Sequence, residues 1–69
     1  MKIPHEFREV TLTHANLKIP VPIYLGQLAF RYWSTDQKCM LVFCGGGNVF
    51  PALESHEEIE AKVNKALED

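Results

Sequence analysis

The sequence lacks features on which several functional classes depend. It contains no apolar run approaching the roughly 18 residues of a membrane-spanning helix, and residues 1–9 lack the apolar segment of a signal peptide. Its 7 basic residues are outnumbered by 9 acidic ones, whereas nucleic-acid-binding domains are typically strongly basic. We therefore expect a soluble, cytoplasmic protein with no membrane segment, and we do not expect nucleic acid as its partner.

Cysteine and histidine are also scarce. Cys39 and Cys44 are five positions apart in one expected strand, where an odd spacing points them to opposite faces. This geometry favours buried free thiols over a disulfide. The three histidines, His5, His14 and His56, show no metal-ligand spacing. We therefore expect no metal, no cofactor and no catalytic residue.

Apolar residues, by contrast, are sufficient for a core. They make up 46% of the 69 residues, which fit one small domain spanning residues 1–69. A single helix covers only one face of a small sheet. We expect the uncovered face to be closed by a partner protein or by a second copy of the chain.

The clearest strand pattern spans residues 38–53. Residues 38–44 form an apolar run typical of a central strand, and a Gly-Gly-Gly-Asn turn follows at residues 45–48. Residues 49–53 form a second strand, in which Pro51 indicates an edge or a strand end. The glycines do not lead into a helix, and no Gly-Lys-Ser/Thr follows them, which argues against a phosphate-binding loop.

A helix over residues 55–67 closes the chain. Ser55 and Glu58 match a capping box, in which each side chain bonds the other residue's backbone amide. Acidic residues gather in the first turns, where the helix dipole favours negative charge. The apolar residues recur at helical spacing and form one stripe: Ile59, Val63, Ala66 and Leu67.

The first half of the chain predicts two strands after an extended N-terminal segment at residues 1–8. In residues 9–14, Val10 and Leu12 alternate with polar residues and indicate a half-buried strand. The next apolar residues also alternate, at positions 17, 19, 21 and 23. Pro20 and Pro22 exclude this segment from the middle of a sheet, so we expect a protected edge strand, with a Pro-rich docking arm as the alternative.

Residues 27–33 predict a further strand, followed by a turn at residues 34–37. In this strand Leu28, Phe30 and Tyr32 face one way, and Ala29, Arg31 and Trp33 face the other. The short turns favour antiparallel pairing of consecutive strands. The sequence therefore predicts an α+β fold, with an antiparallel meander of four to five strands and one C-terminal helix packed on one face.

One stretch carries a family resemblance. A strand, a glycine-containing turn, a second strand and Glu54-Ser55-His56-Glu57-Glu58-Ile59 leading into a helix follow one another over residues 40–63. In this order of elements the stretch resembles the end of small flagellar accessory proteins of the FlbD type. The resemblance implies a hairpin followed by a capped helix, and we transfer no functional residue from it.

The leading functional hypothesis is a non-enzymatic protein-binding module with a regulatory or accessory role. Tyr, Trp and Arg are enriched at interface hot spots, and an acidic helix can engage a basic partner. The candidate partner-binding residues are Tyr24, Arg31, Trp33, Glu57 and Glu60.

Two alternatives remain open. Tyr24, Arg31, Tyr32 and Trp33 could form a stacking platform for single-stranded nucleic acid, unless Tyr32 belongs to the core. Cys44, beside the glycine turn, is the candidate for a small thiol-dependent enzyme or sensor.

Overall fold

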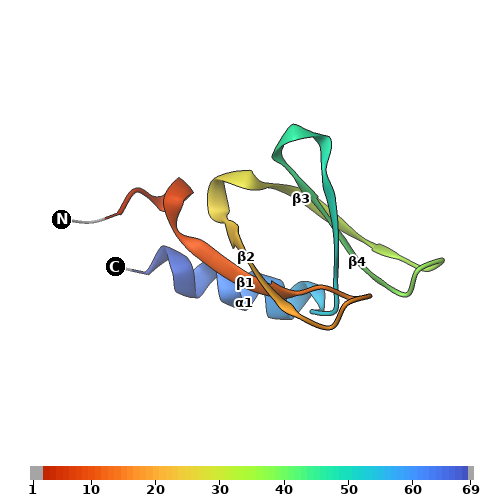
Figure 1. Ribbon diagram of the computed structural model, residues 1–69. Coiled ribbons are helices and arrows are strands. Elements are labelled where there is room, and N and C mark those ends of the chain that lie inside the picture. The colour runs from red at the N-terminus through yellow and green to blue at the C-terminus, as the bar shows by residue number, and fades with distance from the viewer. Residues whose placement is uncertain (1–2, 69) are drawn as a thin grey trace.

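The computed structural model describes residues 3–68. Its regular elements are five strands and one helix: β1 (Glu9–Thr13), β2 (Pro20–Tyr24), β3 (Leu28–Ser34), β4 (Cys39–Cys44), β5 (Val49–Ala52) and α1 (His56–Leu67). Three 3-10 helices complete it: η1 (His5–Phe7), η2 (Leu25–Gln27) and η3 (Gly45–Gly47). The predicted α+β class with a closing helix is confirmed (Figure 1).

The strands form two antiparallel sheets rather than one continuous meander. β1 pairs with β2, and β3, β4 and β5 form the second sheet in that order. The predicted meander is interrupted between β2 and β3, where η2 turns the chain. The sheets meet at the ends of β1 and β5, where the Ala15 amide donates to the Pro51 carbonyl (2.9 Å) and the Leu53 amide to the Thr13 carbonyl (3.0 Å).

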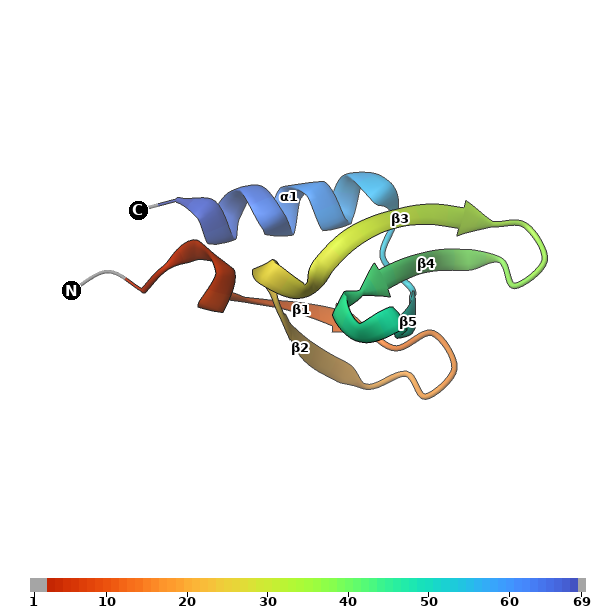
Figure 2. The same ribbon diagram turned by 90° about the horizontal axis from the view of Figure 1, so that it is seen from above.

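One core joins both sheets to the helix. Its buried side chains come from four strands and α1: Val10, Leu12, Ile23, Met40, Val42, Ala52 and Ile59. Val10 and Leu12 are buried as predicted, and α1 packs along β1 (Figures 1 and 2). In β2, Ile23 is buried, whereas Leu17 and Ile19 precede the strand and are exposed. Within residues 3–68, β2 pairs with β1 alone, which confirms the edge position that its prolines predict.

The sequence predicts an extended segment over residues 1–8; residues 1 and 2 lie outside the described residues, and the described part contains a 3-10 helix. His5–Phe7 form η1, which packs against η2. A Cβ atom at Gly26 would lie 2.8 Å from the Glu6 Cβ, so this close approach requires glycine. The Arg8 guanidinium then bonds the carbonyls of Ala66 (2.9 Å) and Glu68 (3.0 Å), satisfying the C-terminal end of α1.

A register shift between Leu28 and Phe30 changes the faces of β3. Leu28 packs against the main core, and Ala29 lies within the irregularity. Leu28 is therefore on the side of Arg31 and Trp33, so its predicted grouping with Phe30 and Tyr32 is wrong. Alternation alone misses this, because one extra residue in a strand reverses every face assignment before it.

The β3–β4 hairpin projects from the body of the molecule. Its turn lies at the end opposite η1 and the last turn of α1 (Figures 1 and 2). The described chain measures 43 × 24 × 20 Å along its principal axes.

Candidate protein-binding face

The central strand β4 divides its sheet into two faces. Met40 and Val42 point into the main core, whereas Cys39 and Leu41 belong to a second cluster against which Phe43 packs. Residues paired across neighbouring strands point to the same face, so the strand register extends this division to β3 and β5. The face opposite the main core is not covered by α1, but Cys39 and Leu41 on it are buried in a cluster with Ala15 of the β1–β2 turn.

Three aromatic rings lie together on this face, beside the buried cluster. Phe30 stacks on Phe43 with ring centroids 4.3 Å apart and planes inclined by 11°. Tyr32 stacks on the same Phe43 ring at 5.6 Å and 24°. Phe30 is 60% exposed and Tyr32 49%, and Val49, paired with Phe43, is 46% exposed. We call Phe30, Tyr32, Phe43 and Val49 the aromatic face.

The strand residues on the same side of the sheet as the aromatic face include no lysine, arginine, aspartate or glutamate. Eight residues of the three strands share it by register: Phe30, Tyr32, Ser34, Cys39, Leu41, Phe43, Val49 and Pro51. Of these described residues, none carries a charge at neutral pH. An exposed cluster of aromatic and apolar side chains is typical of a protein-interaction site, whereas nucleic-acid sites require cations.

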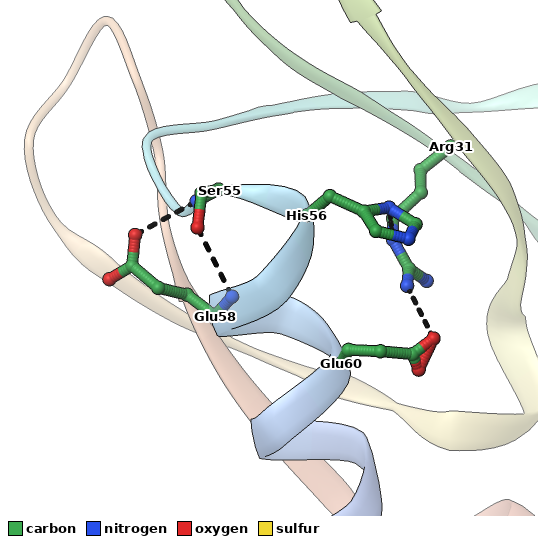
Figure 3. Close-up of polar contacts among 5 residues, drawn as sticks. All are labelled: Arg31, Ser55, His56, Glu58 and Glu60. Carbon is green, nitrogen blue, oxygen red and sulfur yellow. Dashed lines mark hydrogen bonds and ion pairs between the residues drawn. The ribbon is translucent and has the colours of Figure 1, made fainter.

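Two of the residues selected from the sequence contact each other on the opposite side of β3. Arg31 donates from Nη2 to Glu60 Oε1 (2.9 Å) and from Nε to His56 Nδ1 (3.2 Å), as Figure 3 shows. The guanidinium therefore ties β3 to the first turns of α1. Arg31 is largely covered, and its positive charge is already matched by the Glu60 carboxylate.

The other three selected residues lie apart from this ion pair. Tyr24 is on β2, where its ring meets Phe7 edge-on at 6.5 Å. Trp33 is exposed on the core side of β3, near the projecting turn, and Glu57 is exposed on α1. Tyr24 therefore comes from the other sheet, and the assignment of these residues as partner contacts stays a prediction.

Sequence reasoning missed Phe30 and Phe43 as site residues. Both lie in segments recognised as strands, but their contact depends on the pairing of Phe30 with Phe43 across the hairpin. That register follows from the turn at residues 35–38, where Lys38 adopts a φ of 55°. No sequence pattern indicates a positive φ at a lysine. The sequence therefore could not predict that Phe30 and Phe43 are paired and stacked.

The first turn of α1 is fixed by polar contacts. Glu58 N donates to Ser55 Oγ (3.1 Å), and Ser55 N donates to Glu58 Oε1 (3.0 Å), which confirms the predicted capping box (Figure 3). The hydrogen bonds from the Ser55 amide and hydroxyl, with a smaller contribution from Lys62, lower the pKa of Glu58. These contacts are structural, since they stabilise the helix start.

Glu54 makes a second structural contact that the sequence did not indicate. Its carboxylate, only 9% exposed, accepts from the Thr13 amide (2.9 and 3.1 Å) and the Thr13 hydroxyl (2.9 Å). The contact spans 41 positions and joins the end of β1 to the residue before the helix cap. It holds α1 in place against the two sheets.

The thiols lie on opposite faces of β4, as predicted, and both are free. Burial raises the pKa of the partly covered Cys44 thiol, which contacts the Val42 carbonyl at 3.9 Å. A raised pKa lowers the thiolate fraction on which nucleophilic attack depends.

An open cleft of about 470 Å³ lies between η1, η2 and α1, with Leu25, Leu28 and Val63 among its lining residues. Among residues 3–68, no group of three or more His, Cys, Asp or Glu side chains is placed to hold a metal ion. No helix in that range is long and apolar enough to cross a membrane.

Comparisons with models of protein families, with curated proteins and with solved structures found no match for this chain.

Proposed function

We propose that this protein is a small non-enzymatic module that binds another protein through its aromatic face, in a regulatory or accessory role. The observation that supports this best is the stack of Phe30, Tyr32 and Phe43, which remains exposed on an uncharged surface. Exposed aromatic rings bury a large apolar area at little cost in conformational entropy. The matching partner surface is apolar and uncharged at its centre.

A single-stranded nucleic acid is the second candidate ligand, because bases stack on aromatic residues of sheets. The stacked rings favour this hypothesis, but the phosphate backbone needs cations beside them. The described residues on the aromatic face supply none, and Arg31 on the other side is paired with Glu60. Protein is therefore the better-supported ligand.

We also propose that the protein is cytoplasmic and that its function does not depend on the Cys44 thiol. A cytoplasmic location agrees with two free cysteines, since that compartment keeps thiols reduced. The raised pKa of Cys44 gives no support to a thiol-dependent activity. We therefore propose that Cys44→Ser retains binding to the partner.

Capture from a lysate of the source cells, carried out with and without nuclease treatment, tests the proposal. The baits are the wild type, Val49→Lys and Asn64→Lys. Val49 lies on the aromatic face and Asn64 is exposed on α1, so both variants add one positive charge at exposed positions on different elements. Circular dichroism and thermal unfolding verify that each variant is folded.

Proteins recovered with the wild type and Asn64→Lys, but lost with Val49→Lys, support binding through the aromatic face. Equal recovery with all three baits, or recovery of nothing specific, contradicts it. Recovery that disappears on nuclease treatment and on raising the salt concentration identifies nucleic acid instead. Recovery of the chain itself, lost with Val49→Lys, identifies a second copy packed on the aromatic face.

A further inference from the structure

The two sheets end in edge strands of opposite character. β2 carries Pro20 and Pro22, which lack backbone N–H groups and so protect its edge against further pairing. β3, one edge of the three-stranded sheet, has seven residues and no proline, whereas β5 at the opposite edge contains Pro51. An unprotected edge strand presents unpaired N–H and C=O groups that pair readily with another strand.

In the outer half of β3, Tyr32 and Trp33 are exposed, and the strand ends at the buried Ser34. His56 and Glu60 of α1 meet β3 at Arg31, and the helix then runs back beside η2, where Val63 lines the cleft with Leu25. The hairpin end of β3 projects away from α1 towards the β3–β4 turn (Figure 2). Trp33 in this part is 52% exposed.

We propose that two copies of the chain associate by antiparallel pairing of their β3 edges around a two-fold axis at Tyr32. This inference is independent of the aromatic-face proposal. It goes beyond that proposal by assigning the β3 edge to a second copy and leaving the aromatic face free for a different partner. The dimer joins two three-stranded sheets into one sheet of six strands.

Self-pairing of β3 restricts the possible registers. Directly opposed residues of an antiparallel pair point to the same face. One residue of β3 must therefore lie opposite its own copy at the two-fold axis. An axis at Arg31 would place two guanidinium groups directly opposite each other, which is unfavourable. An axis at Phe30 would extend the pairing into the register shift after Leu28.

The axis at Tyr32 avoids both problems. Tyr32 then faces Tyr32 of the second copy on the outer side, and the two aromatic faces become continuous. On the core side, Arg31 faces Trp33 of the second copy, an arrangement that permits a cation–π contact. The exposed Trp33 is covered, and like charges do not oppose each other within residues 30–34.

Disulfide trapping tests this register. In a Cys39→Ala/Cys44→Ala background, single cysteines are introduced as Tyr32→Cys or Phe30→Cys and oxidised under identical conditions. Position 32 opposes itself, with Cα atoms about 4.5–5.5 Å apart and within disulfide reach, whereas position 30 opposes position 34. Phe30→Cys is the matched control, because it shares the strand and the face.

The proposal expects at least about fivefold more covalent dimer from Tyr32→Cys than from Phe30→Cys, since only the self-opposed position meets disulfide geometry. Mixing Phe30→Cys with Ser34→Cys must give the mixed dimer. Equal yields from both positions, or no dimer from Tyr32→Cys, overturn it.

Sedimentation equilibrium of the unmodified chain separates this dimer from the aromatic-face proposal. Val49 lies two strands away from the β3 edge, so Val49→Lys must self-associate like the wild type even if it loses its protein partner. A wild type that stays monomeric at millimolar concentration overturns edge pairing. Dissociation caused by Val49→Lys also overturns it, because that dimer would be packed through the aromatic face.

Discussion

Phe30 and Phe43 stack across β3 and β4 with ring centroids 4.3 Å apart, although Phe30 remains 60% exposed. Stacking on the partly buried Phe43 orients the Phe30 ring but leaves most of it exposed. A side chain that is already ordered loses little further entropy when a partner binds. The pair therefore has the properties of a preformed contact surface.

Phe30→Ala removes a ring that is mostly in water. We expect it to lower the free energy of unfolding by about 0.5–1.5 kcal/mol, the range measured for an aromatic pair. Urea denaturation followed by Trp33 fluorescence measures this loss. A loss as large as the about 3–5 kcal/mol of a buried phenylalanine would show that Phe30 belongs to the core.

Glu54→Leu leaves the partly buried Thr13 amide without its carboxylate partner. We expect a loss of about 1–3 kcal/mol in the free energy of unfolding, because a buried donor without an acceptor keeps its full desolvation cost. Glu54→Gln retains an oxygen acceptor and must lose less. Equal losses in urea denaturation would contradict a hydrogen-bonding role for Glu54.

Ser55→Ala removes the hydroxyl that accepts from the Glu58 amide. We expect the free energy of unfolding to fall by about 1 kcal/mol, as for other N-cap substitutions. In a domain of this size the melting temperature drops by about 4–8 °C. Ser55→Asp keeps an acceptor and serves as the control, so a similar drop in both variants would exclude capping as the cause.

The lowered pKa of Glu58 makes part of the stability dependent on pH. A carboxyl whose pKa is lowered in the folded state stabilises it above its ordinary pKa, near 4.5. This contribution is lost as the pH falls through the lowered value. Thermal unfolding between pH 7 and pH 3 must therefore show the wild type losing its advantage over Glu58→Gln below about pH 4.5. A constant difference would contradict this linkage.

The parts of the fold that depend on neighbouring residues were predictable from the sequence. The α1 helix begins after Ser55 because the cap, the acidic first turn and the apolar stripe all lie within residues 55–67. Pro20 and Pro22 identify the β2 edge through their missing N–H groups. These features follow from local physical chemistry, without knowledge of the remaining contacts.

The parts that depend on distant pairing were not predictable. The Leu28 position follows from a register shift that the alternation of apolar residues does not reveal. The bond between Thr13 and Glu54 spans 41 positions, and a glutamate before a helix cap gives no indication of burial.

The candidate site was predictable only in its residue types. Aromatic residues and arginine in β3 indicated an interaction surface, and their alternation separated Phe30 and Tyr32 from Arg31 and Trp33, but the sequence did not show which side faces the core. Arg31 lies on the core side against Glu60, whereas Phe30 stacks on Phe43 on the other. The side that faces the core follows from the β3–β4 register, in which Arg31 pairs with the buried Val42 and Phe30 with Phe43.

The most direct test of protein binding through the aromatic face is a titration of the ¹⁵N-labelled chain with the captured partner, followed by NMR. The proposal predicts that the largest shift changes occur at the amides of Phe30, Tyr32, Phe43 and Val49. The amides of Glu57 and Asn64 on α1 should change little. Changes concentrated on α1, with the amides of the aromatic face unaffected, would contradict the central claim.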